Sequence, residues 1–352
     1  MRLEFAPYLL KFKEPAITSR EVMVEKPTFL IKIFDEADPS CFGIGEASVF
    51  PGLSPEADGN YVLKLTELMA NVAIGKSTDL SRYSSIQFGL EQAILDFSNG
   101  CRGIYYPGEF TKGKQEIEIN GLIWMGTYRE MMERIEIKMK EGFRCMKLKI
   151  GAIGWEEELE MLRHIRKRFS KEELIVRVDA NGAFTPQECL PKLYELAKFD
   201  IHSIEQPIKA GNPEAMAKLC KETPVPIALD EELIGKPSSQ DRISLLESIK
   251  PQYIVLKPSL CGGFSGAMEW IREAKNRNIG WWITSALESN VGLNAIAQWT
   301  ATLPCEGAQG LGTGALFNNN FSTPITLHKD TLKYNPQEII NYDQFSGLKW
   351  HS

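Results

Sequence analysis

Five charged residues in the second half of the chain each end a short apolar run: Lys149, Asp179, Glu205, Asp230 and Lys257. They recur about every 25 to 30 residues, which is the length of one strand-plus-helix unit in a barrel of alternating strands and helices. A charged group at the end of a buried strand is costly unless it is paired or bound to a metal. We therefore expect these five side chains to converge at one mouth of a barrel.

The three carboxylates of this set are suited to binding a divalent cation. Asp179, Glu205 and Asp230 would end three consecutive strands, and hard oxygen ligands grouped around one point are the arrangement that Mg²⁺ prefers. No Cys or His stands beside them in the sequence, which argues against zinc and favours magnesium, with manganese as an alternative. Each acid alone could instead be a helix cap or part of a loop ion pair. Their joint position at three strand ends favours a metal site.

The segment CMKLKIG contains two lysines of one predicted strand. Lys147 and Lys149 are two residues apart, so their side chains point the same way. Two neighbouring ammonium groups lower each other's pKa, and a nearby dication adds to this effect, so one lysine could be neutral near pH 7 and act as a base. Lys257 would face them from across the barrel. The alternative is an exposed strand edge with solvated lysines, but a closed barrel has no such edge.

Eight short apolar runs follow one another from about residue 116. They are EINGLIWM, RCMKLKIG, ELIVRVDANG, HSIEQP, VPIALDEE, QYIVLKPS, GWWITSALE and EGAQGLGTG. Most are separated by segments with apolar residues at helical spacing, such as EEELEMLRHIRKRF and FSGAMEWIREAKNRN. Continuous apolar runs are expected of strands that are covered on both faces. The pattern predicts an α/β fold in which residues 113–315 form a (β/α)8 barrel, a modified TIM barrel.

Residues 1–112 have a different pattern, typical of an α+β domain. The runs MRLEFAPYLLKF and PTFLIKIFDE predict strands, while GNYVLKLTELMANVAIG and SSIQFGLEQAILDFSNG predict helices. The stretches ITSREVMVEKPT and GIGEASVFPGLSPEADG are interpreted as loops. The tail, residues 316–352, continues no repeat, and we expect it to return to the N-terminal domain.

Composition and charge restrict the partners and the compartment. The chain has 352 residues and a net charge of −6, with no basic stripe, so neither a nucleic-acid nor a membrane partner is expected. The N-terminus becomes charged before it reaches the length of a signal peptide or a transmembrane segment. Seven scattered cysteines, without a CxxC pair, predict reduced thiols in the cytoplasm.

Together, the Lys-x-Lys pair, the three successive acids and the lysine of the sixth strand resemble the active-site residues of the enolase superfamily, in its muconate-lactonizing subgroup. The resemblance covers almost the whole chain. It implies an α+β capping domain, completed by the tail, over the barrel. It also implies a small-molecule carboxylate substrate and a lysine base that works with Mg²⁺ on an enediolate intermediate.

Two local segments are similar to one family within that superfamily. GIGEASVFPGLSPE and SALESNVGL resemble corresponding segments of the o-succinylbenzoate synthases. Those carbon–oxygen lyases of menaquinone biosynthesis dehydrate SHCHC (2-succinyl-6-hydroxy-2,4-cyclohexadiene-1-carboxylate) to o-succinylbenzoate. The resemblance implies that Lys149 removes the α-proton, that Mg²⁺ stabilises the enediolate, that Lys257 supplies charge from the opposite face and that Lys147 supports Lys149.

The resemblance also suggests roles for residues around these. Asp230 is expected to be the third metal ligand because the family's ligand directly ends the strand, with Glu231 as the alternative. Asn181 would orient the metal site. Three further residues look suited to bind the succinyl end of the substrate, namely Ser285, Gly310 and Gly312. Serine and glycine at such positions also commonly form turns.

Alternative functions use the same residues differently. An N-acylamino acid (N-succinylamino acid) racemase would use Lys149 and Lys257 on the two faces of the α-carbon. A barrel aldolase would form a Schiff base at Lys257 and leave the acids without a role. A dipeptide epimerase is disfavoured because GLGTGALF lacks the Asp-x-Asp typical of that group. Loops near residues 18–26 and 45–56 would decide specificity, and the oligomeric state stays open.

Overall fold

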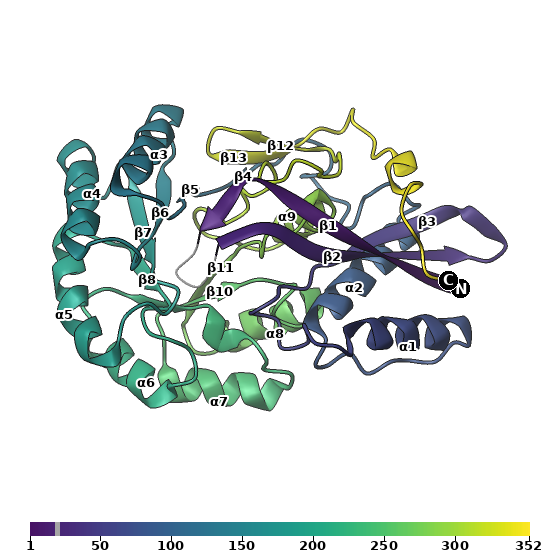
Figure 1. Cartoon of the computed structure of the whole chain (residues 1–352), viewed down its shortest axis with the longest axis horizontal. Coiled ribbons are helices and arrows are strands. Elements are labelled where there is room, and N and C mark those ends of the chain that lie inside the picture. The colour runs from purple at the N-terminus through teal and green to yellow at the C-terminus, as the bar shows by residue number, and fades with distance from the viewer. Residues whose placement is uncertain (18–21) are drawn as a thin grey trace.

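The computed structural model describes residues 1–17 and 22–352. Its N-terminal part is an antiparallel sheet of three long strands in the order β1-β2-β3, with two helices packed on it (Figure 1). These elements are β1 (Arg2–Ile17), β2 (Val22–Asp35), β3 (Asp38–Ala47), α1 (Tyr61–Ala73) and α2 (Ser84–Ser98). Phe5 and Ile31 of the sheet share one buried cluster with Leu65 of α1. The strands predicted at β1 and β2 and the helices predicted at α1 and α2 are confirmed. Strand β3 was not predicted, and its residues Gly43–Ala47 were expected to belong to a loop.

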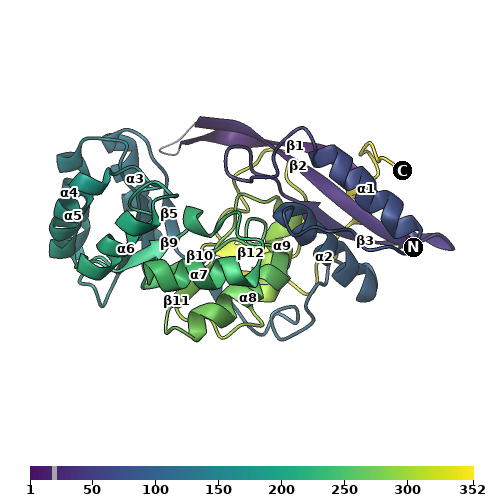
Figure 2. The same cartoon turned by 90° about the horizontal axis from the view of Figure 1, so that it is seen from below.

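The next part of the chain is built around a curled sheet of seven parallel strands in the order β5-β6-β7-β8-β9-β10-β11. The strands are β5 (Gly121–Ile123), β6 (Cys145–Lys149), β7 (Ile175–Asp179), β8 (Ser203–Glu205), β9 (Ile227–Leu229), β10 (Tyr253–Leu256) and β11 (Gly280–Ile283). Each coincides with a predicted apolar run, because strands covered on both faces contain few exposed positions. In the view of Figure 2, the neighbouring strands β1 and β2 run above this sheet.

The eighth predicted run, EGAQGLGTG, connects the two edge strands of the curled sheet. Gln309 forms a parallel bridge with Ile119, just before β5, and Gly310 forms one with Thr284, just after β11. The Asn120 N–H donates to the Gln309 carbonyl at 3.0 Å. This run is therefore a bridging segment with isolated pairings rather than a regular strand.

Helices lie around the outside of the curled sheet (Figure 1). They are α3 (Tyr128–Glu141), α4 (Trp155–Arg168), α5 (Pro186–Leu196), α6 (Pro213–Glu222), α7 (Ser239–Ile249), α8 (Gly263–Lys275) and α9 (Asn290–Thr300). Helix α3 was not predicted from the sequence, although its signals are present there. Thr127 and Glu130 form a capping box, Gly142 ends the helix with φ of 79°, and Met131 and Ile135 are buried at a spacing of one turn.

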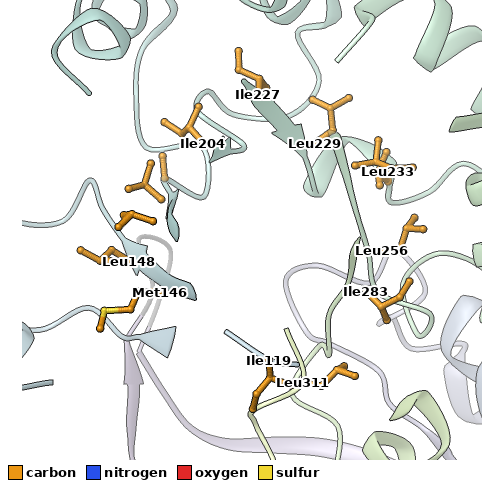
Figure 3. Close-up of a cluster of buried hydrophobic side chains, with 14 of the residues drawn as sticks. Ile119, Met146, Leu148, Ile204, Ile227, Leu229, Leu233, Leu256, Ile283 and Leu311 are labelled. Atoms are coloured by element: carbon orange, nitrogen blue, oxygen red, sulfur yellow. The ribbon is translucent and has the colours of Figure 1, made fainter. Parts of the chain in front are cut away.

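Apolar side chains fill the space between the strands and these helices. Figure 3 shows Met146 and Leu148 of β6 on the outer side of the ring of strands, with Ile204, Leu229 and Ile283 in the same layer. Successive side chains of a strand point to opposite faces. The residues between these apolar positions therefore face the interior of the ring.

The tail runs back along the N-terminal sheet. Its strand β12 (Ile325–His328) pairs with β13 (Thr331–Tyr334), which pairs in turn with β4 (Ile117–Glu118). Short 3₁₀ helices of the described residues are η1 (Ala197–Phe199), η2 (Glu231–Leu233) and, in the tail, η3 (Tyr342–Phe345). Phe317 and His351 form antiparallel bridges with Phe12 and Phe5 of β1. The domain boundaries near residues 112 and 316 stay a prediction.

The predicted loop at residues 17–28 is largely wrong. Strand β2 begins at Val22, and Met23 pairs with Ala16 of β1. The charged residues Glu25 and Lys26 made this stretch resemble a loop, but here they belong to a long strand. Residues 18–21 of the predicted specificity loop lie outside the described residues.

The expectation of reduced thiols is wrong for two cysteines. Cys41 of β3 and Cys101, just after α2, form a disulfide with their Cα atoms 5.9 Å apart. They are 60 residues apart in the chain, so only the packing of α2 on β3 brings them together. The other five cysteines are free. Among the described helices, none is both long and apolar enough to cross a membrane.

Candidate active site

The strand register places three of the predicted residues side by side. Lys149 of β6 is aligned with Asp179 of β7, which is aligned with Glu205 of β8. Neighbouring residues in register point to the same face of a sheet. Because Met146 and Leu148 point outward (Figure 3), Lys149 and its neighbours in register face the interior of the ring.

Each of the three predicted lysines contacts a predicted metal ligand. Lys147 Nζ lies 2.9 Å from Asp179 Oδ2 and 2.6 Å from Glu205 Oε2. Lys149 Nζ lies 3.1 Å from Asp179 Oδ2, and Lys257 forms an ion pair with Asp230. The structure therefore brings all six residues into one cluster, in which ammonium groups lie between the carboxylates.

Asn181 and Glu231 lie next to this cluster. The Lys149 ammonium donates to Asn181 Oδ1 at 2.6 Å, and the Asn181 N–H donates to Asp179 Oδ1 at 3.0 Å. The Asn181 side-chain amide donates to Glu231 Oε1 at 3.2 Å. Asn181 thus contacts the candidate base as well as a candidate metal ligand, while Asp230 is the acid that pairs with Lys257.

A cavity of about 90 Å³ opens beside the lysines. Eight of the site residues predicted from the sequence line this cavity: Lys147, Lys149, Asp179, Asn181, Lys257, Ser285, Gly310 and Gly312. Glu205 and Asp230 do not line the cavity themselves. They form ion pairs with Lys147 and Lys257, which do. The cavity therefore joins the candidate base to the candidate succinyl end of the site.

Other lining residues were not singled out from the sequence. They are Met23, Phe50, Leu53, Asn120, Leu122, Trp124, Thr284, Ala286, Leu287 and Thr313. The ring centroid of Trp124 lies 5.8 Å from Lys149 Nζ, and Thr313 Oγ1 lies 2.7 Å from Ser285 Oγ. Most of these residues are apolar and resemble core positions in the sequence. Met23, Phe50 and Leu53 lie in the two loops that were expected to decide specificity, and Thr313 stands next to the predicted Gly310–Gly312 segment.

Neighbouring carboxylates raise the pKa of two of the lysines, Lys147 and Lys257. Burial disfavours the charged form of Lys147, but Asp179 and Glu205 outweigh this effect and raise its pKa. Burial likewise opposes the charge of Lys257, and Asp230 and Glu205 raise its pKa. The expected lowering is therefore wrong for Lys147, because the two acids that it contacts outweigh its lysine neighbour.

The two central acids differ from each other. Burial favours the neutral form of Asp179, but Lys147 and Lys149 outweigh burial and hold its pKa below the usual range. Burial raises the pKa of Glu205 to about 8, and the charge of Asp179 adds to this effect. Of these two acids, Glu205 therefore has the less compensated charge.

The donor set fits a hard divalent cation. Asp179, Glu205 and Asp230 offer carboxylate oxygens, and Glu205 Oε1 is buried without a hydrogen-bond partner among the described residues. Within residues 1–17 and 22–352, no three acid, His or Cys side chains already form a cation cage. The contacts of Lys147 and Lys257 with the acids would have to loosen for a cation to bind.

Comparisons with known proteins identify relatives of the chain. Residues 130–334 match the family described as "Enolase C-terminal domain-like". An o-succinylbenzoate synthase from Desulfotalea psychrophila is 43% identical, over 93% of this chain and 97% of its own. The crystal structure of MenC from the same organism has a TM-score of 0.80 at 39% identity, covering 95% of this chain and 99% of that one.

A more distant structure has the same fold. Muconate lactonizing enzyme has a TM-score of 0.76 at 21% identity, covering 99% of both chains. The family match spans more than half of the chain, and the relative from Desulfotalea psychrophila is similar over nearly all of it. The chain therefore belongs to the enolase superfamily.

Proposed function

We propose that the chain is a carbon–oxygen lyase that dehydrates SHCHC to o-succinylbenzoate in menaquinone biosynthesis. One observation carries the proposal: Lys149 and Lys257 line the same cavity, each in contact with a separate buried acid. The relative that is 43% identical is an o-succinylbenzoate synthase, which supports this reaction over others of the superfamily.

Lys149 is the proposed base and then the proposed acid. In its neutral form, Lys149 Nζ takes the proton from the substrate carbon next to the carboxylate. The ammonium so formed returns a proton to the departing hydroxyl group, so that one water leaves and the ring becomes aromatic. Asn181 Oδ1, at 2.6 Å from Nζ, accepts a hydrogen bond from Lys149 and orients it.

Lys257 would hold positive charge near the substrate carboxylate throughout the reaction. Asp230 and Glu205 raise its pKa, which favours the ammonium form. Lys147 has the same property and would steady the carboxylates that surround Lys149. The two flanking lysines therefore stay charged while Lys149 exchanges its proton.

Asp179, Glu205 and Asp230 would hold Mg²⁺, with Mn²⁺ as an alternative. When bound, the cation supplies a second positive charge beside the substrate carboxylate and makes the neighbouring C–H more acidic. Glu231 supports this site through Asn181.

We further infer a complete (β/α)8 barrel, in which the segment around Gln309 and Gly310 takes the place of the eighth strand, and a capping domain formed by residues 1–112 with the tail. Bridges from this segment to both edge strands support the barrel. Ser285, Gly310 and Gly312 would receive the succinyl end, because they line the cavity away from the strand ends that carry the acids.

The test is the loss of SHCHC absorbance with the purified protein, in Mg²⁺ and again in excess EDTA. We expect metal-dependent turnover that Lys149→Ala reduces by about a thousandfold or more, while the surface variant Lys171→Ala, whose partner Asp200 is also exposed, keeps wild-type rates. Absence of turnover by the Mg²⁺-loaded protein would contradict the proposal. Racemisation of N-succinylamino acids would then be assayed, and borohydride trapping at Lys257 would identify an aldolase.

A further inference from the structure

A second group of charged side chains is buried between the N-terminal sheet and the mouth of the curled sheet. Lys26 of β2 is 1% exposed, and Glu46 of β3 and Glu288, after β11, are fully buried. None of these three side chains lines the active-site cavity. Because a buried charge is costly without compensation, the contacts of each residue indicate what the group does.

Glu46 attaches the end of β3 to the start of α9. Its carboxylate accepts hydrogen bonds from the Ser289 N–H at 2.9 Å and from the Gly292 N–H at 3.0 Å. A carboxylate at a helix N-terminus is stabilised by the free N–H groups there. A Cβ at position 292 would lie 2.8 Å from Glu46 Oε2, so glycine permits this close approach.

Glu288 connects two loops that border the cavity. Its carboxylate accepts from the Ala286 N–H at 2.6 Å and from the Ser259 hydroxyl at 2.6 Å. Ala286 lines the cavity, and Ser259 follows the cavity residue Lys257 by two positions. One buried acid therefore fixes the segments after β10 and β11 relative to each other.

Lys26 ties β2 to the loop after β3. Its ammonium donates to Ser48 Oγ at 2.6 Å and lies 5.7 Å from the ring centroid of Phe50, which lines the cavity. Burial lowers the pKa of Lys26, while the charges of Glu46 and Glu288 raise it. Opposite charges on Glu46 and Glu288 therefore offset part of the cost of burying Lys26.

We propose that Lys26, Glu46 and Glu288 form a buried positioning triad that holds two walls of the substrate cavity, Phe50 and the Ala286–Leu287 loop, at a fixed separation. The identity of the substrate, SHCHC, rests on the proposed function. The triad acts through these walls and does not touch the reacting atoms. Its loss therefore weakens substrate binding while the lysine–acid cluster remains intact.

The first test separates substrate binding from chemistry. In Glu288→Ala, we expect KM for SHCHC to rise about tenfold while kcat changes by less than about threefold, because an interaction common to ground and transition states is lost. Glu288→Gln should restore KM to within about threefold of the wild type, since its amide oxygen can accept from Ala286 and its NH₂ can donate to Ser259.

A matched control measures the effect of losing a buried acid elsewhere. Asp96 of α2 is fully buried and accepts hydrogen bonds from the Gly103 N–H at 2.7 Å and from the Ile44 N–H at 2.9 Å, but it does not line the cavity. Asp96→Asn should lower the melting temperature and leave KM unchanged. If Glu288→Ala behaves in the same way, with a lower melting temperature and an unchanged KM, the triad is only structural and the proposal is overturned.

A second measurement needs no substrate and stays informative if SHCHC is not turned over. In Lys26→Met, which keeps a similar volume without the charge, we expect faster backbone hydrogen exchange at residues 48–54 and 285–288 than in the wild type or Asp96→Asn. Unchanged exchange in both segments would overturn the proposal. Failure of the wild type to dehydrate SHCHC would instead overturn only the proposed function.

Discussion

The side-chain oxygen of Asn181 lies 2.6 Å from Lys149 Nζ, and the backbone N–H of Asn181 donates to Asp179 at 3.0 Å. Asn181 has a φ of 45°, in the left-handed region that asparagine tolerates better than most residues. This backbone conformation turns the side chain back toward the strand end. One residue thus orients both the candidate base and a candidate metal ligand.

Replacing Asn181 with Asp should change how activity depends on pH. A carboxylate at this position would stabilise the ammonium form of Lys149, so the acidic limb of the kcat/KM profile should move to higher pH, by about one unit. Asn181→Ala should lower kcat by about 10- to 100-fold without this movement, because the orienting acceptor is lost. Identical pH profiles for Asn181→Asp and the wild type would show that Asn181 does not act on the base.

Mg²⁺ should stabilise the folded protein through the three acids. A ligand that binds only the folded state at 100 times its Kd adds about 2.7 kcal/mol, so Mg²⁺ should raise the melting temperature by several degrees. We expect Glu205→Gln to lose this increase. Asp241→Asn, which changes an exposed acid of α7, should keep it. Equal stabilisation of Glu205→Gln and the wild type would place the cation elsewhere.

Gly310 and Gly312 should respond differently to a methyl group. A Cβ at position 310 would lie 2.2 Å from Thr284 Oγ1 and 2.6 Å from Thr284 Cβ, whereas at position 312 the nearest atom is Ile119 Cδ1 at 3.4 Å. We expect Gly310→Ala to lower the free energy of unfolding by about 1–3 kcal/mol, because overpacking strains the bridge to Thr284. Gly312→Ala should leave the free energy of unfolding unchanged and should instead alter KM.

A compensating substitution tests the cause of this effect. Adding Thr284→Gly to Gly310→Ala removes the Thr284 side chain and should recover stability relative to Gly310→Ala alone, as measured by urea unfolding. Equal stability of the single variants Gly310→Ala and Gly312→Ala would contradict the steric argument.

His202 should make the protein sensitive to acid. Burial and the nearby charge of Arg177 lower its pKa from 6.5 to about 4. The unfolded chain therefore binds a proton more readily, so the stabilisation is complete above pH 6.5 and is lost as the pH falls toward 4. Because the ring is partly exposed, solvent screens it, and its contribution to the free energy of unfolding should be about 1–2 kcal/mol.

The measurement is urea unfolding at pH 7.5 and at pH 4.5. His202→Gln should lose less stability between these pH values than the wild type. His328→Gln, which changes an exposed residue of β12, should match the wild type. If the two variants show the same acid sensitivity, His202 is not the responsible group.

The strands that contain or directly precede the six candidate active-site residues could be predicted from the sequence. Apolar runs that end in Asp179 or Glu205 are local signals, because a buried strand must exclude charge except where it ends. The two-residue spacing of Lys147 and Lys149 likewise determines that they share a face. The capping box and the apolar spacing of helix α3 are also local signals, so this helix too could have been predicted from the sequence.

Other features depend on contacts between distant parts of the chain. The pairing of Cys41 with Cys101 and the burial of Lys26 beside Glu46 and Glu288 have no local pattern, because packing of the N-terminal sheet creates them. The residues at the strand ends also do not show which acid pairs with which lysine. The sequence therefore did not show that acids would raise the pKa of Lys147. By itself, the sequence determined which residues end each strand, since hydrophobic periodicity is local. The tertiary structure decided the register, the disulfide and the walls of the cavity, since these depend on which distant segments pack together.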